Sequence, residues 1–136
     1  MNLLIGIDPG VKTGIAVWGQ GELQLVKSGS AVEAENYILS RLDLHTVKLR
    51  IEDARKRTWY GKAGPERKQG AGSIKRDSQR WQEFCEHHEL EFQMIHPKNN
   101  TTKLKADKFK RYTGWAGKTN EHSRDAAMLV YRGQGG

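Results

Sequence analysis

The sequence predicts an α/β fold in which one mixed, five-stranded sheet is flanked by helices. Near the N-terminus, three strand-like segments follow one another with only tight turns between them, which is typical of an antiparallel meander. After them, helical patterns alternate with two further strand-like segments, and this alternation indicates strands added in parallel. The predicted order is three meander strands, helix, strand, helix, strand and two helices.

The meander strands are predicted at residues 3–8, 13–18 and 22–27. The first is a short, continuous apolar run that ends on a lone carboxylate, Asp8, which indicates a buried strand with a charge at its end. Pro9 and Gly10 follow, and these are the residue types of a tight turn. A buried charge is costly without a positive partner, so Asp8 is the first candidate functional residue.

The first helix and the fourth strand come next. Ser30 and Glu33 form a capping box at a helix start, and an apolar stripe follows them. Residues 46–52 are predicted to form the fourth strand, in which Lys48 and Arg50 alternate with an apolar face. Two explanations stay open: the polar face is thinly covered, or these two residues have acidic partners.

The second half of the chain is predicted to hold a long loop, one strand and three helices. Residues 54–72 combine Gly and Pro with many charges and no period, which is typical of a long functional loop. The elements after it are expected at about 73–89 (helix), 91–96 (strand), from a cap at 99–102 to about Tyr112 (basic helix) and from Asn120 onward (helix). With a disordered tail at 133–136, residues 1–136 are expected to form a single domain.

Positive charge is concentrated in two short segments. The chain carries 23 Lys and Arg against 16 Asp and Glu, a formal net charge of +7. Fifteen of the 23 lie between Ala54 and Arg76 or between Lys98 and Lys118, and each segment contains one acid. Scattered surface charge would not cluster in this way, so a surface for phosphate groups is the better interpretation.

The cysteine count and the lengths of the apolar segments limit the class of protein. Cys85 is the one cysteine, so no internal disulfide is possible, and its place in a helical pattern favours a small core residue. No stretch approaches the roughly 18 apolar residues that a membrane span needs, and no basic leader precedes an apolar segment at the N-terminus. We therefore expect a soluble, intracellular protein with no membrane partner.

Four potential metal ligands lie at the ends of predicted elements. Asp8 ends the first strand and Glu52 the fourth, whereas His122 and Asp125 share one face of the last helix through their i, i+3 spacing. Each residue alone has a plainer explanation as a turn residue, ion-pair partner or helix cap. Together with the basic segments, they favour a metal site.

This set of ligands predicts a particular metal chemistry. Oxygen ligands with one imidazole favour Mg²⁺ or Mn²⁺ over zinc. Two such ions about 4 Å apart would activate a water on one side of a phosphodiester and stabilise the leaving oxygen on the other, with Asp8 bridging both ions. Asp53 follows Glu52, and a slip of one residue in the strand register would exchange which acid faces the metal.

Three motifs surround these residues: Ile5-Gly6-Ile7-Asp8-Pro9-Gly10 with Thr13-Gly14, then Ile51-Glu52, then His122-Ser123-Arg124-Asp125-Ala126-Ala127. In this order they resemble the RuvC family of Holliday junction resolvases, within the RNase H-like nuclease superfamily. The resemblance spans almost the whole chain. The chain is shorter than typical cellular members of that family, which suggests a compact, phage-type variant.

The resemblance implies an RNase H-like fold and a homodimer whose two active sites cleave four-way DNA junctions by Mg²⁺-dependent hydrolysis. Asp8, Glu52 and Asp125 would be the metal carboxylates, and His122 matches a position that holds His or Asp in the family. Lysines after the fifth strand contact phosphate in the family. This implies DNA contacts at Lys103, Lys105 and Lys108.

In the family, an aromatic residue in the loop after the second acidic position stacks on bases at the junction centre. Trp59 or Tyr60 would take that role here, since base–aromatic stacking is worth roughly 1–3 kcal/mol per base. The basic residues around this pair complete the predicted DNA-binding set: Arg55, Lys56, Arg57 and Lys62.

The predicted function is that of a structure-selective DNA endonuclease of recombination and repair, in the cytoplasm of a bacterial or phage-infected cell. One alternative is a RuvC-like nuclease that acts on structured RNA or on RNA–DNA hybrids, although Asp8-Pro9-Gly10 favours the resolvase branch. The other is a non-catalytic nucleic-acid-binding module. The usable side chains at all four ligand positions argue against it.

Overall fold

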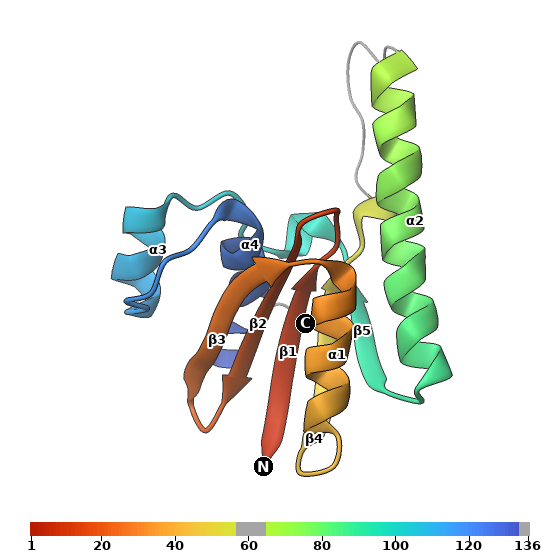
Figure 1. The fold of residues 1–136 in the computed structure, drawn as a ribbon. Coiled ribbons are helices and arrows are strands. Elements are labelled where there is room, and N and C mark those ends of the chain that lie inside the picture. Colours follow the sequence, from red (N-terminus) through yellow and green to blue (C-terminus); the bar gives the residue numbers. More distant parts are fainter. Residues whose placement is uncertain (57–64, 134–136) are drawn as a thin grey trace.

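The computed structural model describes residues 1–56 and 65–133 and shows one five-stranded sheet with helices on both faces (Figure 1). The strands are β1 (Asn2–Asp8), β2 (Thr13–Gly19), β3 (Glu22–Gly29), β4 (Thr46–Glu52) and β5 (Glu91–Ile95). The longer helices are α1 (Ala31–Arg41), α2 (Pro65–His87), α3 (Ala106–Thr113) and α4 (Glu121–Val130). The predicted α/β fold class is confirmed.

The sheet has the order β3-β2-β1-β4-β5, with β1 in its centre. β1 pairs antiparallel with β2 and parallel with β4, while β5 adds parallel to β4, as predicted for a meander with two parallel additions. Ile7 of β1 lies opposite Ile51 of β4. Asp8 and Glu52, each one residue further on, therefore leave the sheet at the same edge.

Two hydrophobic clusters cover the two faces of the sheet. Ile5 and Leu49 face α1 and α2 and pack in a cluster that includes Trp81. Leu4 and Ala16 face α4, whose apolar side forms the second cluster. Because side chains alternate along a strand, Gly6, Asp8 and Glu52 share the face that α4 covers.

The polar face of β4 contacts the end of α4. The Arg50 guanidinium donates to the carbonyl oxygens of Leu129 at 3.3 Å and Gly133 at 2.7 Å, and to Gln93 Oε1 at 3.2 Å. A guanidinium at a helix C-terminus satisfies free carbonyls and complements the helix dipole. Lys48 Nζ lies 3.7 Å from Glu91 Oε1. Two explanations were left open by the sequence. Lys48 has an acidic partner, as one of them predicted, whereas Arg50 donates to backbone carbonyl oxygens.

The structure corrects the predicted loop at 54–72. A short 3-10 turn, η1 (Ala54–Lys56), follows β4, and α2 already begins at Pro65, eight residues before the predicted helix start at 73. Proline is favoured in the first turn of a helix because its missing N–H would be unpaired there anyway. Residues 57–64 of the predicted loop and 134–136 of the predicted tail lie outside the described residues.

The predicted basic helix also starts later than expected. A 3-10 turn, η2 (Pro97–Asn99), is followed by an irregular segment, and α3 covers only Ala106–Thr113. The irregular segment runs along α4, where Arg124 Nε donates to the carbonyl oxygen of Leu104 at 2.6 Å and Asp125 Oδ1 accepts from the Lys103 N–H at 2.8 Å. These long-range bonds take the place of a helical turn. Within the described residues, no helix is long and apolar enough to cross a membrane.

Candidate metal centre

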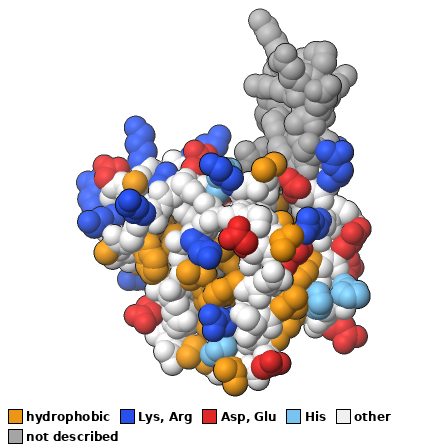
Figure 2. All heavy atoms as spheres, viewed as in Figure 1, with side chains coloured by type: hydrophobic (Ala, Val, Ile, Leu, Met, Phe, Trp, Pro, Cys, Tyr) orange, Lys and Arg blue, Asp and Glu red, His pale blue; other side chains and the backbone are white. Residues whose placement is uncertain are grey.

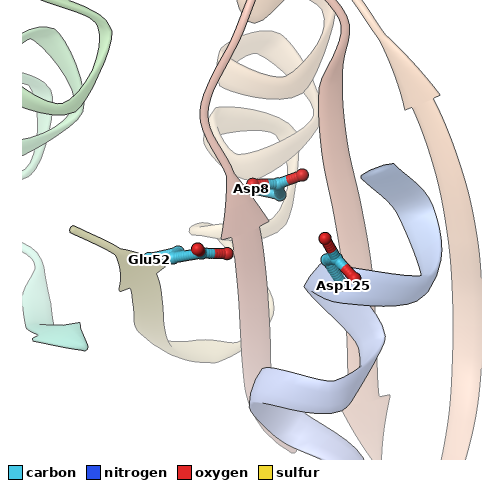
Figure 3. Close-up of side chains that lie close together, drawn as sticks. All are labelled: Asp8, Glu52 and Asp125. Carbon is cyan, nitrogen blue, oxygen red and sulfur yellow. The ribbon is translucent and has the colours of Figure 1, made fainter. Parts of the chain in front are cut away.

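Three carboxylates from separate elements converge at the end of the sheet (Figure 3). Asp8 comes from the end of β1, Glu52 from the end of β4 and Asp125 from the second turn of α4. One oxygen of each lies within 4.8 Å of the others. Glu52 is 1% exposed and Asp125 is 7% exposed, so two of the three carboxylates are almost withdrawn from water.

Two glycines let α4 approach the sheet closely enough to form this group. A Cβ at Gly6 would overlap the carbonyl oxygen of Ala126, and one at Gly14 would overlap that of His122. Gly14 lies directly opposite Asp8 in the sheet. The backbone of α4 therefore packs directly against β1 and β2 beside Asp8.

The start of α4 is fixed by its own cap. Asn120 Oδ1 accepts from the Ser123 N–H at 2.9 Å, and Ser123 Oγ accepts from the Asn120 N–H at 2.9 Å. Asn120 also donates through Nδ2 to Ser28 Oγ of β3. The reciprocal bonds satisfy helix donors that would otherwise be free, and the bond to β3 ties this end of α4 to the sheet.

Burial makes the group costly when it is fully ionised. Burial raises the pKa of Asp125 to about 6, the nearby Glu52 carboxylate adds to this rise, and a hydrogen bond from the Lys103 backbone N–H opposes it. That N–H lies 2.8 Å from Asp125 Oδ1. Adjacent carboxylates repel one another, and a cation between them would remove this cost.

The raised pKa of Asp125 predicts that neutralising this carboxylate stabilises the metal-free protein. The folded pKa is about 6 against an ordinary value of 3.8, so ionisation costs the native state free energy and stability falls as the pH rises through this window. We expect Asp125→Asn to exceed the wild type in stability by about 2 to 3 kcal/mol above pH 6, since one unit of pKa corresponds to about 1.4 kcal/mol.

Urea unfolding of both proteins in EDTA, from pH 4 to pH 8, measures this difference. Asparagine keeps the oxygen that accepts the Lys103 N–H, so the comparison isolates the charge. The difference should vanish towards pH 4. A difference that is constant across the range would contradict the role of the ionised carboxylate.

His122 contacts one member of the group instead of joining it directly. Its Nδ1 lies 3.1 Å from Asp8 Oδ2, and the imidazole side chain is 46% exposed. The group whose oxygens all lie within 4.8 Å of one another consists of Asp8, Glu52 and Asp125. His122 is thus placed beside the site and in contact with Asp8.

The structure groups Glu52, and not Asp53, with the other two carboxylates. The two residues are neighbours on a strand end and point to opposite faces. Glu52 joins Asp8 and Asp125, whereas Asp53 accepts from Arg55 Nε at 2.8 Å and Arg55 Nη2 at 3.0 Å.

The predicted DNA-binding residues fall into three groups. Lys103, Lys105 and Lys108 are exposed, on the segment before α3 and on α3 itself. Arg55 is bound to neighbouring side chains of the protein. Lys56 is placed only by its backbone in η1, and Arg57, Trp59, Tyr60 and Lys62 lie outside the described residues.

Sequence reasoning missed the backbone that holds Asp125. Lys103 has a φ of 60°, which L-residues seldom adopt, and this conformation presents its N–H to Asp125 Oδ1. Asn100 Nδ2 donates to the Asp125 carbonyl oxygen at 3.1 Å. Nothing in the local sequence signals these contacts, whereas the Gly6 and Gly14 spacing did offer a signal of close approach.

The comparisons with known proteins support the fold. No protein-family model matches the sequence, and no curated protein matches it. Among solved structures, the chain is similar to T. thermophilus RuvC in complex with Holliday junction substrate, with a TM-score of 0.57 and 13% identity over 95% of this chain and 90% of that chain. The chain therefore has a RuvC-like fold, and at this identity the similarity concerns the fold alone. Independently of it, the carboxylate group could hold a metal ion.

Proposed function

We propose that this protein is a Mg²⁺-dependent, structure-selective DNA endonuclease that resolves four-way junctions. The observation that carries the proposal is the convergence of Asp8, Glu52 and Asp125 at one edge of a RuvC-like fold. The similar structure, T. thermophilus RuvC, is described in complex with a Holliday junction substrate. Resemblance in fold supports nuclease chemistry, and the buried carboxylates support a metal ion at the same place.

The residues of the group fit a hard divalent cation. Asp8, Glu52 and Asp125 offer only oxygen ligands, which suits Mg²⁺ or Mn²⁺. When bound, a pair of such ions supplies a metal-activated water and stabilises the charge that develops on the leaving oxygen. We propose His122 as a fourth member that either orients Asp8 or binds metal through its exposed ring.

The protein's own contribution is to hold the carboxylates close together before a substrate arrives. The Lys103 N–H fixes one oxygen of Asp125, and no second hydrogen bond to the other oxygen occurs within the described residues. His122 fixes Oδ2 of Asp8 in a similar way. Preorganised ligands lower the cost of assembling the charged site.

Exposed basic side chains lie next to this edge of the sheet. Lys and Arg gather over α3, at the left of the space-filling view (Figure 2). Phe109 is buried and anchors α3 to the α4 face, while Lys105, Lys108 and Lys110 remain exposed. We propose that this surface binds the phosphate backbone of the substrate beside the metal site.

The double variant Lys105→Gln and Lys108→Gln is expected to weaken DNA binding by a similar factor on every DNA sequence. Each lost phosphate contact lowers the slope of log K against log salt by about 1, because fewer counterions are released. Fluorescence anisotropy with Ca²⁺ in place of Mg²⁺ measures the slope. Glu22→Gln, on the far end of the sheet, is the control, and an unchanged slope in the double variant would contradict this phosphate surface.

Cleavage of a panel of substrates tests the proposed function. Purified protein with Mg²⁺ is expected to cut a four-way DNA junction in preference to a linear duplex, an RNA–DNA hybrid and a structured RNA. Preferred cleavage of RNA or the hybrid would indicate a nuclease that acts on structured RNA or on RNA–DNA hybrids instead. Binding without cleavage would indicate a non-catalytic nucleic-acid-binding module.

A four-way junction has paired cleavage points, so we propose that the active form is a homodimer with two such sites. We propose the cytoplasm of a bacterial or phage-infected cell as its place of action. Sedimentation of the protein with and without junction DNA tests the dimer.

A further inference from the structure

We propose that Arg55 is a positioning residue for the metal centre: it clamps the end of β4 to α2 and thereby holds Glu52 in place. This inference rests on the proposed metal site and deepens it. The sequence pattern had assigned Arg55 to phosphate binding together with its basic neighbours. The contacts of its guanidinium point to a different role.

The Arg55 guanidinium makes four hydrogen bonds to three side chains. Nε and Nη2 form a bidentate pair with Asp53, at 2.8 Å to Oδ1 and 3.0 Å to Oδ2. Nη1 donates to Gln79 Oε1 at 2.6 Å, and Nη2 also donates to Gln82 Oε1 at 2.7 Å. The side chain is 25% exposed, so most of it is already engaged within the protein.

The clamp acts on Glu52 through the adjoining peptide. Asp53 is 2% exposed, and its N–H donates to the carbonyl oxygen of Ile95 at 2.8 Å, which continues the pairing of β4 with β5. Because neighbouring residues point to opposite faces, fixing Asp53 towards α2 directs Glu52 towards Asp8 and Asp125. Rotation at this strand end would withdraw Glu52 from the group.

The other end of the clamp is a well-anchored part of α2. Gln79 and Gln82 are three residues apart and share one helix face. Ser78, just before Gln79, and Trp81, between the two glutamines, are fully buried, and Arg80 pairs with Glu35 of α1 at 2.9 Å. Figure 1 shows α2 beside β5, with η1 reaching it from the end of β4. The helix α2 is therefore a rigid partner that holds the end of β4 in position.

Arginine is specifically suited to this position. Its planar fork reaches a carboxylate and two amide oxygens at once, whereas a lysine ammonium has one nitrogen and cannot reproduce that geometry. Arg55→Lys therefore removes the clamp but keeps the positive charge. A phosphate-binding role predicts the reverse, because an ammonium still binds phosphate.

Calorimetric titration of Mn²⁺ into the metal-free protein tests the inference, with DNA affinity measured in Ca²⁺ as the second readout. We expect Arg55→Lys to raise the Mn²⁺ dissociation constant about 10- to 100-fold, the range typical of residues that support metal ligands, with junction affinity changed less than about twofold. The double variant Gln79→Ala and Gln82→Ala alters no charge and should act in the same direction. Lys75→Gln removes a charge beside the clamp and should leave Mn²⁺ affinity unchanged.

The outcomes separate the two proposals. Wild-type Mn²⁺ affinity in both Arg55→Lys and the glutamine double variant, with folding verified by thermal melting, overturns the positioning role while the metal site stands. The glutamine double variant replaces side chains near the protein surface. It can therefore test the inference even if Arg55→Lys does not fold. Absence of Mn²⁺ binding to the wild type overturns the metal site itself, and the clamp inference with it.

Discussion

Replacing Asp8 with asparagine is expected to abolish Mg²⁺-dependent cleavage and to leave junction binding intact. One carboxylate oxygen of Asp8 lies within 4.8 Å of an oxygen of each of the other two carboxylates, and asparagine has nearly the same shape but one carboxylate oxygen fewer and no charge. Metal-assisted hydrolysis draws several kcal/mol of transition-state stabilisation from the bound ions, so we expect cleavage to fall about 10³-fold or more. The lysines that we propose to bind phosphate, Lys105 and Lys108, lie at the start of α3 and are untouched.

Single-turnover cleavage and anisotropy on the same junction measure the two effects. Asp43→Asn is the matched control, because Asp43 is exposed in the turn after α1 and the change in charge is identical. Retained cleavage in Asp8→Asn would show that the metal site is misassigned. Loss of junction binding in Ca²⁺ would show that Asp8 supports the fold of the binding surface instead.

Replacing Gly14 with alanine is expected to have the largest effect on stability. The new Cβ would overlap the carbonyl oxygen of His122 and lie 3.1 Å from the Ser123 nitrogen, and both neighbours are backbone atoms that cannot turn away. Overpacking of this kind costs about 3 kcal/mol in unfolding free energy. The displacement of α4 should also separate Asp125 from Asp8 and lower Mn²⁺ affinity.

Urea unfolding with and without Mn²⁺ measures both consequences. Gly29→Ala is the control within the same sheet, because the atoms nearest to its new Cβ belong to the Glu33 side chain, at 3.3 Å, and not to the backbone. If Gly14→Ala unfolds at the same urea concentration as the wild type, α4 does not rest on β2 as closely as the structure indicates.

The sequence was sufficient for the sheet and for the convergence of three carboxylates because local rules determine both. A continuous apolar run marks a central strand, and parallel pairing brings the ends of β1 and β4 to one edge. Side-chain alternation then places Asp8 and Glu52 on one face. The i, i+3 spacing on α4, which begins at a cap recognisable in the sequence, brought Asp125 to the same place.

Long-range contacts account for what the sequence did not predict. The irregular path from Asn100 to Lys105 depends on bonds to Asp125 and Arg124 of α4, about twenty residues away. The role of Arg55 depends on Gln79 and Gln82, so a charge that looked like part of a basic loop is engaged inside the fold. Such partners cannot be deduced from the amino-acid composition or from the periodicity of apolar residues.

The most direct test of the central claim is a crystal structure of the protein soaked in Mn²⁺, with anomalous scattering used to locate the ions. We expect anomalous peaks coordinated by carboxylate oxygens of Asp8, Glu52 and Asp125. Peaks only elsewhere on the protein, or none at a Mn²⁺ concentration that supports cleavage, would contradict it.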